Sequence, residues 1–147
     1  TSFYDYLAPK QNERISINYN YNKIISDVTF NVENSRPINA DVLVRQAKPI
    51  LVDLTMNIVI SESSLGVSNT VIQSVKDQLS TTLNSNTLGA VIDQITLINV
   101  AQGVSGVARA RVVYLNKAGV TGQVLTLTAQ KDEYILSNNI IVNTETR

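Results

Sequence analysis

The sequence predicts an α+β fold: a β-α-α-β-β-β two-layer unit, with two helices on one face of a mixed or antiparallel sheet, preceded by an N-terminal arm and helix. Three observations support this prediction. Residues 49–61 alternate apolar and mixed side chains with a period of two, which is typical of a strand with one buried face. Residues 71–84 and 88–100 carry apolar residues at helical spacing instead. Further strand-like segments follow residue 106.

The length of 147 residues suits one domain with an appendage. We expect residues 1–47 to form an N-terminal arm, a helix and a short strand, and residues 48–147 to form the α+β domain. The chain does not begin with Met, and we expect it to be part of a longer protein.

The N-terminal region shows two patterns. Residues 1–14 have no clear period, and their aromatic side chains predict either a loop pinned to a surface or an arm that docks on a partner. Apolar residues at helical spacing predict a helix over residues 18–34. The helix should end before Arg36-Pro37, because the residue before a proline avoids the α region. The segment Ile38–Gln46 is predicted to be a short strand.

The segment Ile50–Ile60 is predicted to be the central strand. Its even-numbered residues are all apolar, and Asp53, Thr55 and Asn57 lie on the opposite face. Each fully buried side chain of this size contributes about 1.5–3 kcal/mol. We therefore expect the apolar face to lie under the two helices and the other face to meet solvent or a neighbouring subunit.

The remaining elements follow in order. Residues 62–67 are predicted to form a loop, with Ser68, Asn69 or Thr70 capping the first helix and Asn86 or Thr87 capping the second. Gly103–Gly106 predicts a turn, because phosphate-binding glycine loops precede a helix and these glycines precede a strand. We expect a strand over residues 107–115, a hairpin connection to a strand over residues 123–130, a turn at Lys131-Asp132 and a last strand over residues 140–142.

Composition narrows the possible functions. The chain has no cysteine and no histidine, so disulfides and cysteine-ligated metals are excluded, and the commonest general base is missing. Twelve basic and twelve acidic residues balance without a basic tract, which argues against a nucleic-acid partner. No apolar run approaches the roughly 20 residues of a membrane span. We expect no catalytic activity, no cofactor, no metal and no small-molecule substrate.

Several residues are candidates for contacts with other proteins. Arg109 and Arg111 share one face of a predicted strand, where they could hold a phosphate or carboxylate or form a solvated or interface-facing surface. Asp53 with Asn57 could be half of a metal site, although a solvent or interface position fits better because no acidic partner stands at ligand spacing. Tyrosine is favoured at protein interfaces. The predicted interface residues are Phe3, Tyr4, Tyr6, Tyr19, Arg109 and Arg111.

One junction resembles a known family. Residues 36–44, RPINADVLV, are similar to the RPI-x-A-x-V-x-V junction of baseplate J-like proteins, the baseplate wedge subunits of contractile-tailed bacteriophages. As in that family, a long alternating strand, two helical segments and a glycine-valine turn before a strand follow the junction. The family's E-Y-x-x-L segment is matched at residues 133–137, except that the leucine comes one position early. The similarity extends over roughly residues 20–143.

The resemblance implies a structural role in the virion. Wedge subunits are assembled in the bacterial cytoplasm and form a ring around the tail tube through contacts with copies of themselves and with other baseplate or tail proteins. The family offers no catalytic residues to carry over. A binding module, such as an adhesin or receptor-binding domain, is the alternative from another class, and a carboxylate-dependent hydrolase is the third hypothesis.

Overall fold

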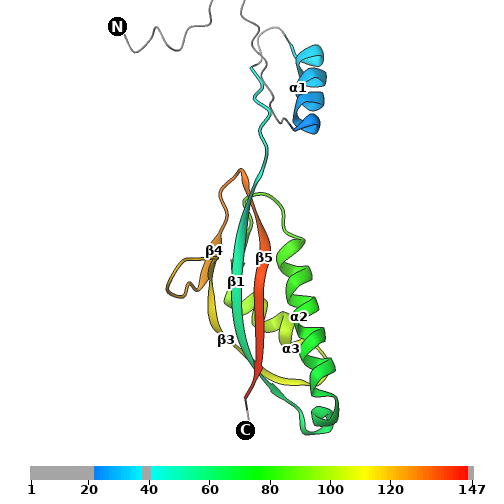
Figure 1. Cartoon of the computed structure of the whole chain (residues 1–147), viewed down its shortest axis with the longest axis vertical. Coiled ribbons are helices and arrows are strands. Elements are labelled where there is room, and N and C mark those ends of the chain that lie inside the picture. The colour runs from blue at the N-terminus through cyan, green and yellow to red at the C-terminus, as the bar shows by residue number, and fades with distance from the viewer. Residues whose placement is uncertain (1–21, 38–40, 146–147) are drawn as a thin grey trace, which may run out of the picture. The chain divides into compact units, whose positions relative to one another are not determined.

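The computed structural model describes residues 22–37 and 41–145. The chain divides into two compact units between Arg45 and Gln46; the sequence predicted a boundary between residues 47 and 48. The first unit contains helix α1 (Lys23–Ser35). The second contains, in chain order (Figure 1), β1 (Lys48–Ile60), the short 3-10 helix η2 (Glu62–Val67), α2 (Ser68–Asn84), β2 (Val91–Asp93), α3 (Gln94–Gln102), β3 (Val107–Lys117), β4 (Thr126–Thr128) and β5 (Glu133–Thr144).

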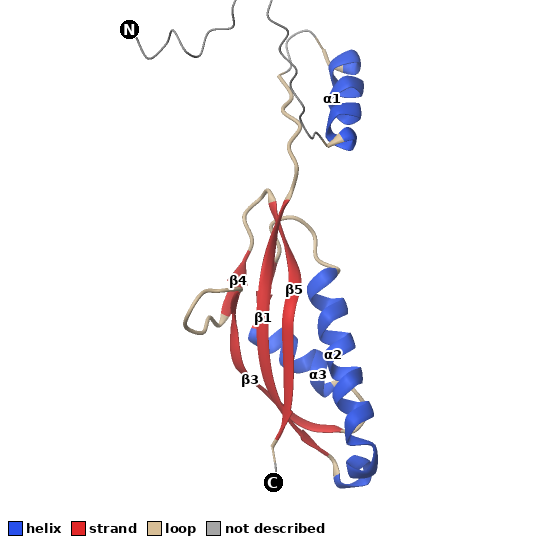
Figure 2. Cartoon of the chain, viewed as in Figure 1, coloured by secondary structure: helices blue, strands red, loops and turns tan. Residues whose placement is uncertain are grey.

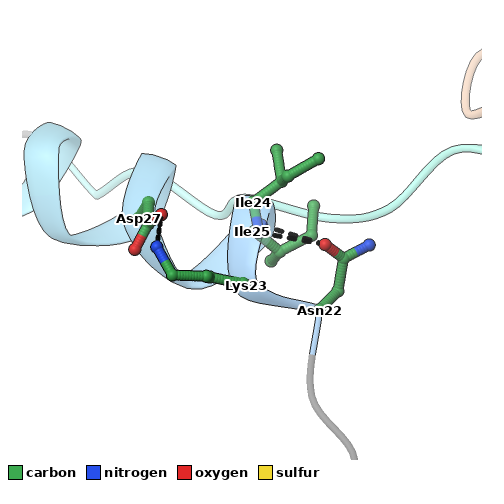
Figure 3. A network of polar contacts seen from close by, with 5 residues as sticks. All are labelled: Asn22, Lys23, Ile24, Ile25 and Asp27. Carbon is green, nitrogen blue, oxygen red and sulfur yellow. Dashed lines mark hydrogen bonds and ion pairs between the residues drawn. The ribbon is translucent and has the colours of Figure 1, made fainter.

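Helix α1 begins at a side-chain cap. Asn22 Oδ1 accepts hydrogen bonds from the backbone N–H groups of Ile24 at 3.1 Å and Ile25 at 3.5 Å. Lys23 Nζ lies 2.9 Å from Asp27 Oδ2, one turn along the helix (Figure 3). The cap satisfies N–H groups that have no partner within the helix. The predicted helix included Asn22, but this residue is extended, at φ −80° and ψ 105°, and the helix begins at Lys23. Residues 18–21 of the prediction lie outside the described residues.

The end of α1 is where the sequence predicts it. The helix ends at Ser35, and Arg36 is extended, at φ −74° and ψ 146°, before Pro37. The predicted short strand over residues 38–46 is wrong for residues 41–46, which form no regular element, while residues 38–40 lie outside the described part. A strand needs a ladder partner, and residues 41–46 pair with no strand of the described chain.

A mixed three-stranded sheet forms the middle of the second unit. Its strand order is β3-β1-β5, with β1 antiparallel to β3 and parallel to β5. Helices α2 and α3 pack on one face of this sheet (Figures 1 and 2). The strands β2 and β4 form a separate two-stranded antiparallel sheet. The predicted α+β class, with two layers and two helices on one face, is confirmed.

Strand β1 has the two faces that its alternation predicts. Its even-numbered residues from Ile50 to Ile60 are all buried, while Asp53, Thr55 and Asn57 between them are partly exposed. The buried face belongs to one core cluster with the apolar stripe of α2, which consists of Val71, Val75, Leu79 and Leu83. The central strand therefore lies under the helical layer, as predicted.

The start of α2 differs from the prediction. The helix begins at Ser68 directly after η2, which replaces the loop expected over residues 62–67. The N-cap position is Val67, and no side chain caps the helix there, so the predicted caps at Ser68, Asn69 or Thr70 are wrong. A preceding 3-10 turn can continue directly into an α-helix, which removes the need for a separate capping residue.

The predicted second helix, over residues 88–100, contains a short strand near its start. Residues 91–93 form β2 and pair with β4, and α3 begins at Gln94. The apolar residues of this segment are compatible with either a helix or a short strand, and pairing with β4 makes residues 91–93 a strand. In this strand Ile92 is buried, and Asp93 Oδ1 accepts a 2.6 Å hydrogen bond from Thr126. The cap predicted at Asn86 or Thr87 is also wrong. The Asn86 amide instead donates to carbonyls in the last turn of α2.

The predicted hairpin after β3 is wrong as well. Only residues 126–128 of the expected strand form β4, which pairs with β2 and not with β3. The buried side chain of Asn116 holds the intervening loop, donating to Gly122 O at 3.0 Å and accepting from Lys117 N at 2.7 Å. The observed order is therefore β-α-β-α-β-β-β, because β2 is inserted between the two helices.

The C-terminal strand is longer than predicted. β5 runs from Glu133 to Thr144 as one element beside β1 and includes the expected strand over residues 140–142. A register shift opposite Val52 and Asp53 accommodates one extra residue, Asn138. None of the helices in the described part of the chain is long and apolar enough to cross a membrane.

Candidate functional site

The face of the three-stranded sheet opposite α2 and α3 gathers the polar side chains of three strands. We call it the outer sheet face. Alternation in β1 directs its odd-numbered residues to this face, and the register brings residues of β3 and β5 beside them. The polar members of the outer sheet face include Asp53, Thr55, Asn57, Arg109, Arg111, Tyr114, Asn138, Asn139, Asn143 and Glu145.

A hydrogen-bond network crosses all three strands at one end of this face. Asn57 lies opposite Arg111 of β3 and Asn143 of β5. The Glu145 carboxylate, directly after β5, accepts hydrogen bonds from Asn57 Nδ2 at 2.7 Å and from the Arg111 guanidinium. Asn143 Nδ2 in turn donates to Asn57 Oδ1 at 3.4 Å. The Glu145 carboxylate therefore connects Asn57 of β1 with Arg111 of β3, and Asn57 is bonded to Asn143 of β5 as well.

The network changes the acidity of Glu145. The hydrogen bonds from Asn57 and then from Arg111 lower the pKa of Glu145; desolvation opposes them, and the positive charges of Arg111 and Arg109 add a lesser lowering. Hydrogen bonds and cationic neighbours favour the charged form of a carboxyl group. Because the group is exposed to solvent, this effect keeps Glu145 ionised without implying a large contribution to stability.

The two predicted interface arginines have different surroundings. Arg111 forms an ion pair with Glu145 of its own chain, so its guanidinium already holds a carboxylate. Arg109 lies opposite Val59 on the same face and is exposed. The strand thus places one arginine in an internal network and directs the other to solvent.

The other charged candidates have local partners. Asp53 Oδ1 accepts a 2.7 Å hydrogen bond from Asn138 Nδ2. Glu133 Oε2 accepts from Gln130 N at 2.9 Å, and Asp132 lies 3.4 Å from Lys48 Nζ across the turn. No group of three acidic residues that could hold a metal ion occurs in the described ranges. These contacts fit the surface position expected for Asp53 and the turn expected at Lys131-Asp132.

The aromatic candidates Phe3, Tyr4, Tyr6 and Tyr19 lie outside the described residues. The structure instead presents apolar side chains at two other places. In α1, which buries none of its residues, Ile24 and Phe30 are exposed. Beside the β2–β4 sheet, Val91, Ile95 and Leu125 are exposed. Gln94 N donates to Leu125 O at 3.0 Å, which places Leu125 beside the start of α3. We call this second group the β2–β4 patch.

A groove of about 400 Å³ lies between α2 and the end of α3. Its α2 side is a stripe of polar side chains one turn apart, and its other side belongs to the last turn of α3 and the residues after it. No charged residue lines it. The lining residues are Ser74, Gln78, Thr82, Asn99, Val100, Gly103 and Val104.

Sequence reasoning missed two participants in the hydrogen-bond network. Glu145 and Asn143 reach the network only because β5 runs parallel to β1 in a particular register. The alternation of β5 could have shown that residues 141, 143 and 145 share one face, but it could not show which strand lies beside them.

The comparisons with known proteins do not assign the chain to a family. No family model matches the sequence, and a search of curated proteins found no significant match. Membership of the baseplate J-like family therefore stays a prediction from the residue 36–44 junction and the order of elements after it.

Proposed function

We propose that this chain is a structural component of a contractile phage tail baseplate, a wedge subunit that assembles by protein–protein contacts into the ring around the tail tube. Its partners are copies of itself and other baseplate or tail proteins. It is assembled in the bacterial cytoplasm and resides in the virion. The resemblance at residues 36–44 supplies the family, and the outer sheet face is the observation that carries the assembly role.

The outer sheet face suits contact with another folded protein. Its side chains come from three paired strands, and hydrogen bonds hold several of them in position. Binding through groups that are already ordered loses less conformational entropy than binding through mobile ones. Amide and guanidinium groups can also form the direct hydrogen bonds that a typical interface contains. The exposed β2–β4 patch adds apolar area of the kind found at interface cores.

The same network favours a structural role over a catalytic one. The Glu145 carboxylate is hydrogen bonded to Asn57 and Arg111, which holds its pKa low and keeps it ionised. A general base needs a pKa nearer the working pH. The proposed function therefore uses neither a cofactor nor a substrate, and it assigns the network to positioning and recognition.

The test is co-purification of the full chain with the other structural proteins encoded in the same genome, followed by antibody labelling of intact virions. We expect association with tail proteins and a label at the baseplate. A chain that stays inert toward every tail protein, with label absent from the virion, would contradict the proposal.

A matched pair of variants tests the surface. Thr55 lies in the middle of the outer sheet face, between Tyr114 and Ile141, and Thr81 is exposed on α2. Thr55→Arg should weaken tail association by roughly tenfold or more, since a long charged side chain there obstructs a close contact. Thr81→Arg should leave it unchanged. Equal effects of both changes would remove the outer sheet face from the proposal.

A binding module is the second candidate function, and the groove between α2 and α3 favours it. The uncharged hydroxyl and amide groups of Ser74, Gln78, Thr82 and Asn99 line part of that groove, and such groups can hydrogen bond a neutral polar ligand such as a glycan. A glycan array probed with the native chain and with Gln78→Ala tests it. Binding lost on Gln78→Ala, together with no tail association, would favour this candidate over the wedge subunit.

A further inference from the structure

The two edges of the three-stranded sheet differ in how well they are protected from pairing with another strand. At the β3 edge, Val124 N donates to Leu115 O at 2.9 Å, so the following loop pairs with part of that edge. Charged side chains at Arg109, Arg111 and Lys117 also lie along β3. Charged residues and covering loops are common means of preventing a strand edge from pairing with another chain.

The C-terminal half of β5 has no such protection. In the first half of the strand, Gly89 N donates to Glu133 O and Asn84 Oδ1 accepts from Ser137 N. After the extra residue Asn138, no described residue pairs with the outer edge. Residues 134–144 contain no lysine, arginine, proline or acidic residue. An edge of this kind readily accepts another strand.

The backbone orientation of this half follows from one hydrogen bond. Glu145 N donates to Ile58 O at 2.8 Å, so the backbone of Glu145 faces β1. Alternation then directs the N–H and C=O groups of Ile140, Val142 and Thr144 away from β1. These groups have no hydrogen-bond partner among the described residues, and they are spaced as a further strand would need.

We propose that this edge pairs with the same edge of a second copy, antiparallel, about a two-fold axis at Ile141. In this register Ile140 lies opposite Val142 of the other copy, and both have outward-facing backbone groups. They therefore exchange a pair of N–H···O=C hydrogen bonds on each side of the axis. The two sheets join into one continuous six-stranded sheet with the order β3-β1-β5-β5-β1-β3.

The side chains agree with this register on both faces. On the outer face, Ile141 of one copy meets Ile141 of the other, and Asn139 meets Asn143. On the inner face, Ile140 meets Val142, which extends the apolar face that α2 covers. No charged residue faces another across the axis, because residues 139–143 of the two copies lie opposite each other and Glu145 lies beyond them. A second copy is therefore the partner that we propose, because its identical edge can hydrogen bond the free backbone groups of this one in a two-fold arrangement.

This surface builds on the assembly role proposed above, but its test needs no other protein. The chain has no cysteine, so Ile141→Cys introduces a single thiol. The pair at the axis is not hydrogen bonded, with a Cα–Cα separation of about 4.5 Å, inside the range of about 4.4–6.8 Å that a disulfide requires. Mild oxidation of the full chain should produce a covalent dimer.

Val113→Cys is the matched control, because Val113 is 41% exposed on the protected edge strand and Ile141 is 42% exposed. We expect rapid cross-linking of Ile141→Cys and none of Val113→Cys. Failure of Ile141→Cys to cross-link, or equal cross-linking of both variants, would overturn the proposed register.

Sedimentation velocity supplies the second readout. The native chain should be a dimer at high micromolar concentration, and Ile141→Lys should raise the dissociation constant by at least about 100-fold, since it places two like charges side by side. Val113→Lys should leave the dimer intact. At a low concentration where the native chain is monomeric, both variants should keep the native thermal unfolding curve. A monomeric native chain would overturn this proposal, even if that monomer binds tail proteins. A dimer that binds no tail protein would count against the assembly role alone.

Discussion

Replacement of Leu54 by alanine tests the two faces of β1 most directly. Leu54 is 1% exposed within the core cluster, whereas Leu51, three residues earlier on the same strand, is 45% exposed. Leu→Ala at a fully buried position costs about 2–5 kcal/mol, through lost transfer free energy and the remaining cavity. The same change at a half-exposed position removes about half the burial and should cost about 1 kcal/mol.

The free energy of unfolding can be measured by urea titration of the full chain, followed by circular dichroism. Equal m-values in the native chain and both variants would show that the same surface is exposed on unfolding. For a unit of about 100 residues, 1 kcal/mol shifts Tm by about 4–8 °C. Leu54→Ala should therefore lower Tm by at least about 8 °C and Leu51→Ala by clearly less. Equal losses at the two positions would refute the assignment of the faces.

Three further outcomes are expected. Val52→Asp should unfold the second unit, because a buried carboxylate without a partner costs several kcal/mol, while Asn57→Asp should remain folded; circular dichroism distinguishes them, and equal thermal stability would contradict the burial pattern. The pKa of the Glu145 carboxyl group should lie below its usual value of 4.5. Its small stabilising effect is therefore present above pH 4.5 and is lost as the pH falls through the lowered pKa. An unshifted pKa in an NMR titration would contradict the network. Gly106→Ala should cost more than Gly119→Ala in urea titrations, because both have positive φ but only a methyl group at Gly106 meets other atoms, at 2.9 Å; equal costs would contradict the close packing there.

Elements with a strong local signal could be predicted from the sequence. The period of two in residues 50–60 identified β1 and its buried face, and the spacing of Val71, Val75, Leu79 and Leu83 identified α2. Pro37 placed the end of α1. In each case a chemical property of nearby residues determines the local backbone, so no knowledge of distant contacts is needed.

Elements that depend on distant partners were mispredicted. Residues 88–93 carry apolar side chains compatible with a helix, but Ile92 is buried in a ladder with β4, more than thirty residues away in sequence. The strand expected over residues 38–46 does not form within residues 41–46, because no partner strand is present for them in the described chain. Strand formation needs a second strand, whereas helical hydrogen bonds lie within one segment.

The sequence by itself therefore determined the class of the fold, the buried face of β1 and the apolar stripe of α2, since these follow from local periodicity. The tertiary structure alone decided that β5 runs parallel to β1, that Glu145 meets Asn57 and Arg111, and that no described residue pairs with the outer edge of the C-terminal half of β5. The physical reason is that strand order and register arise from pairing between distant segments, which leaves the alternation of each strand unchanged.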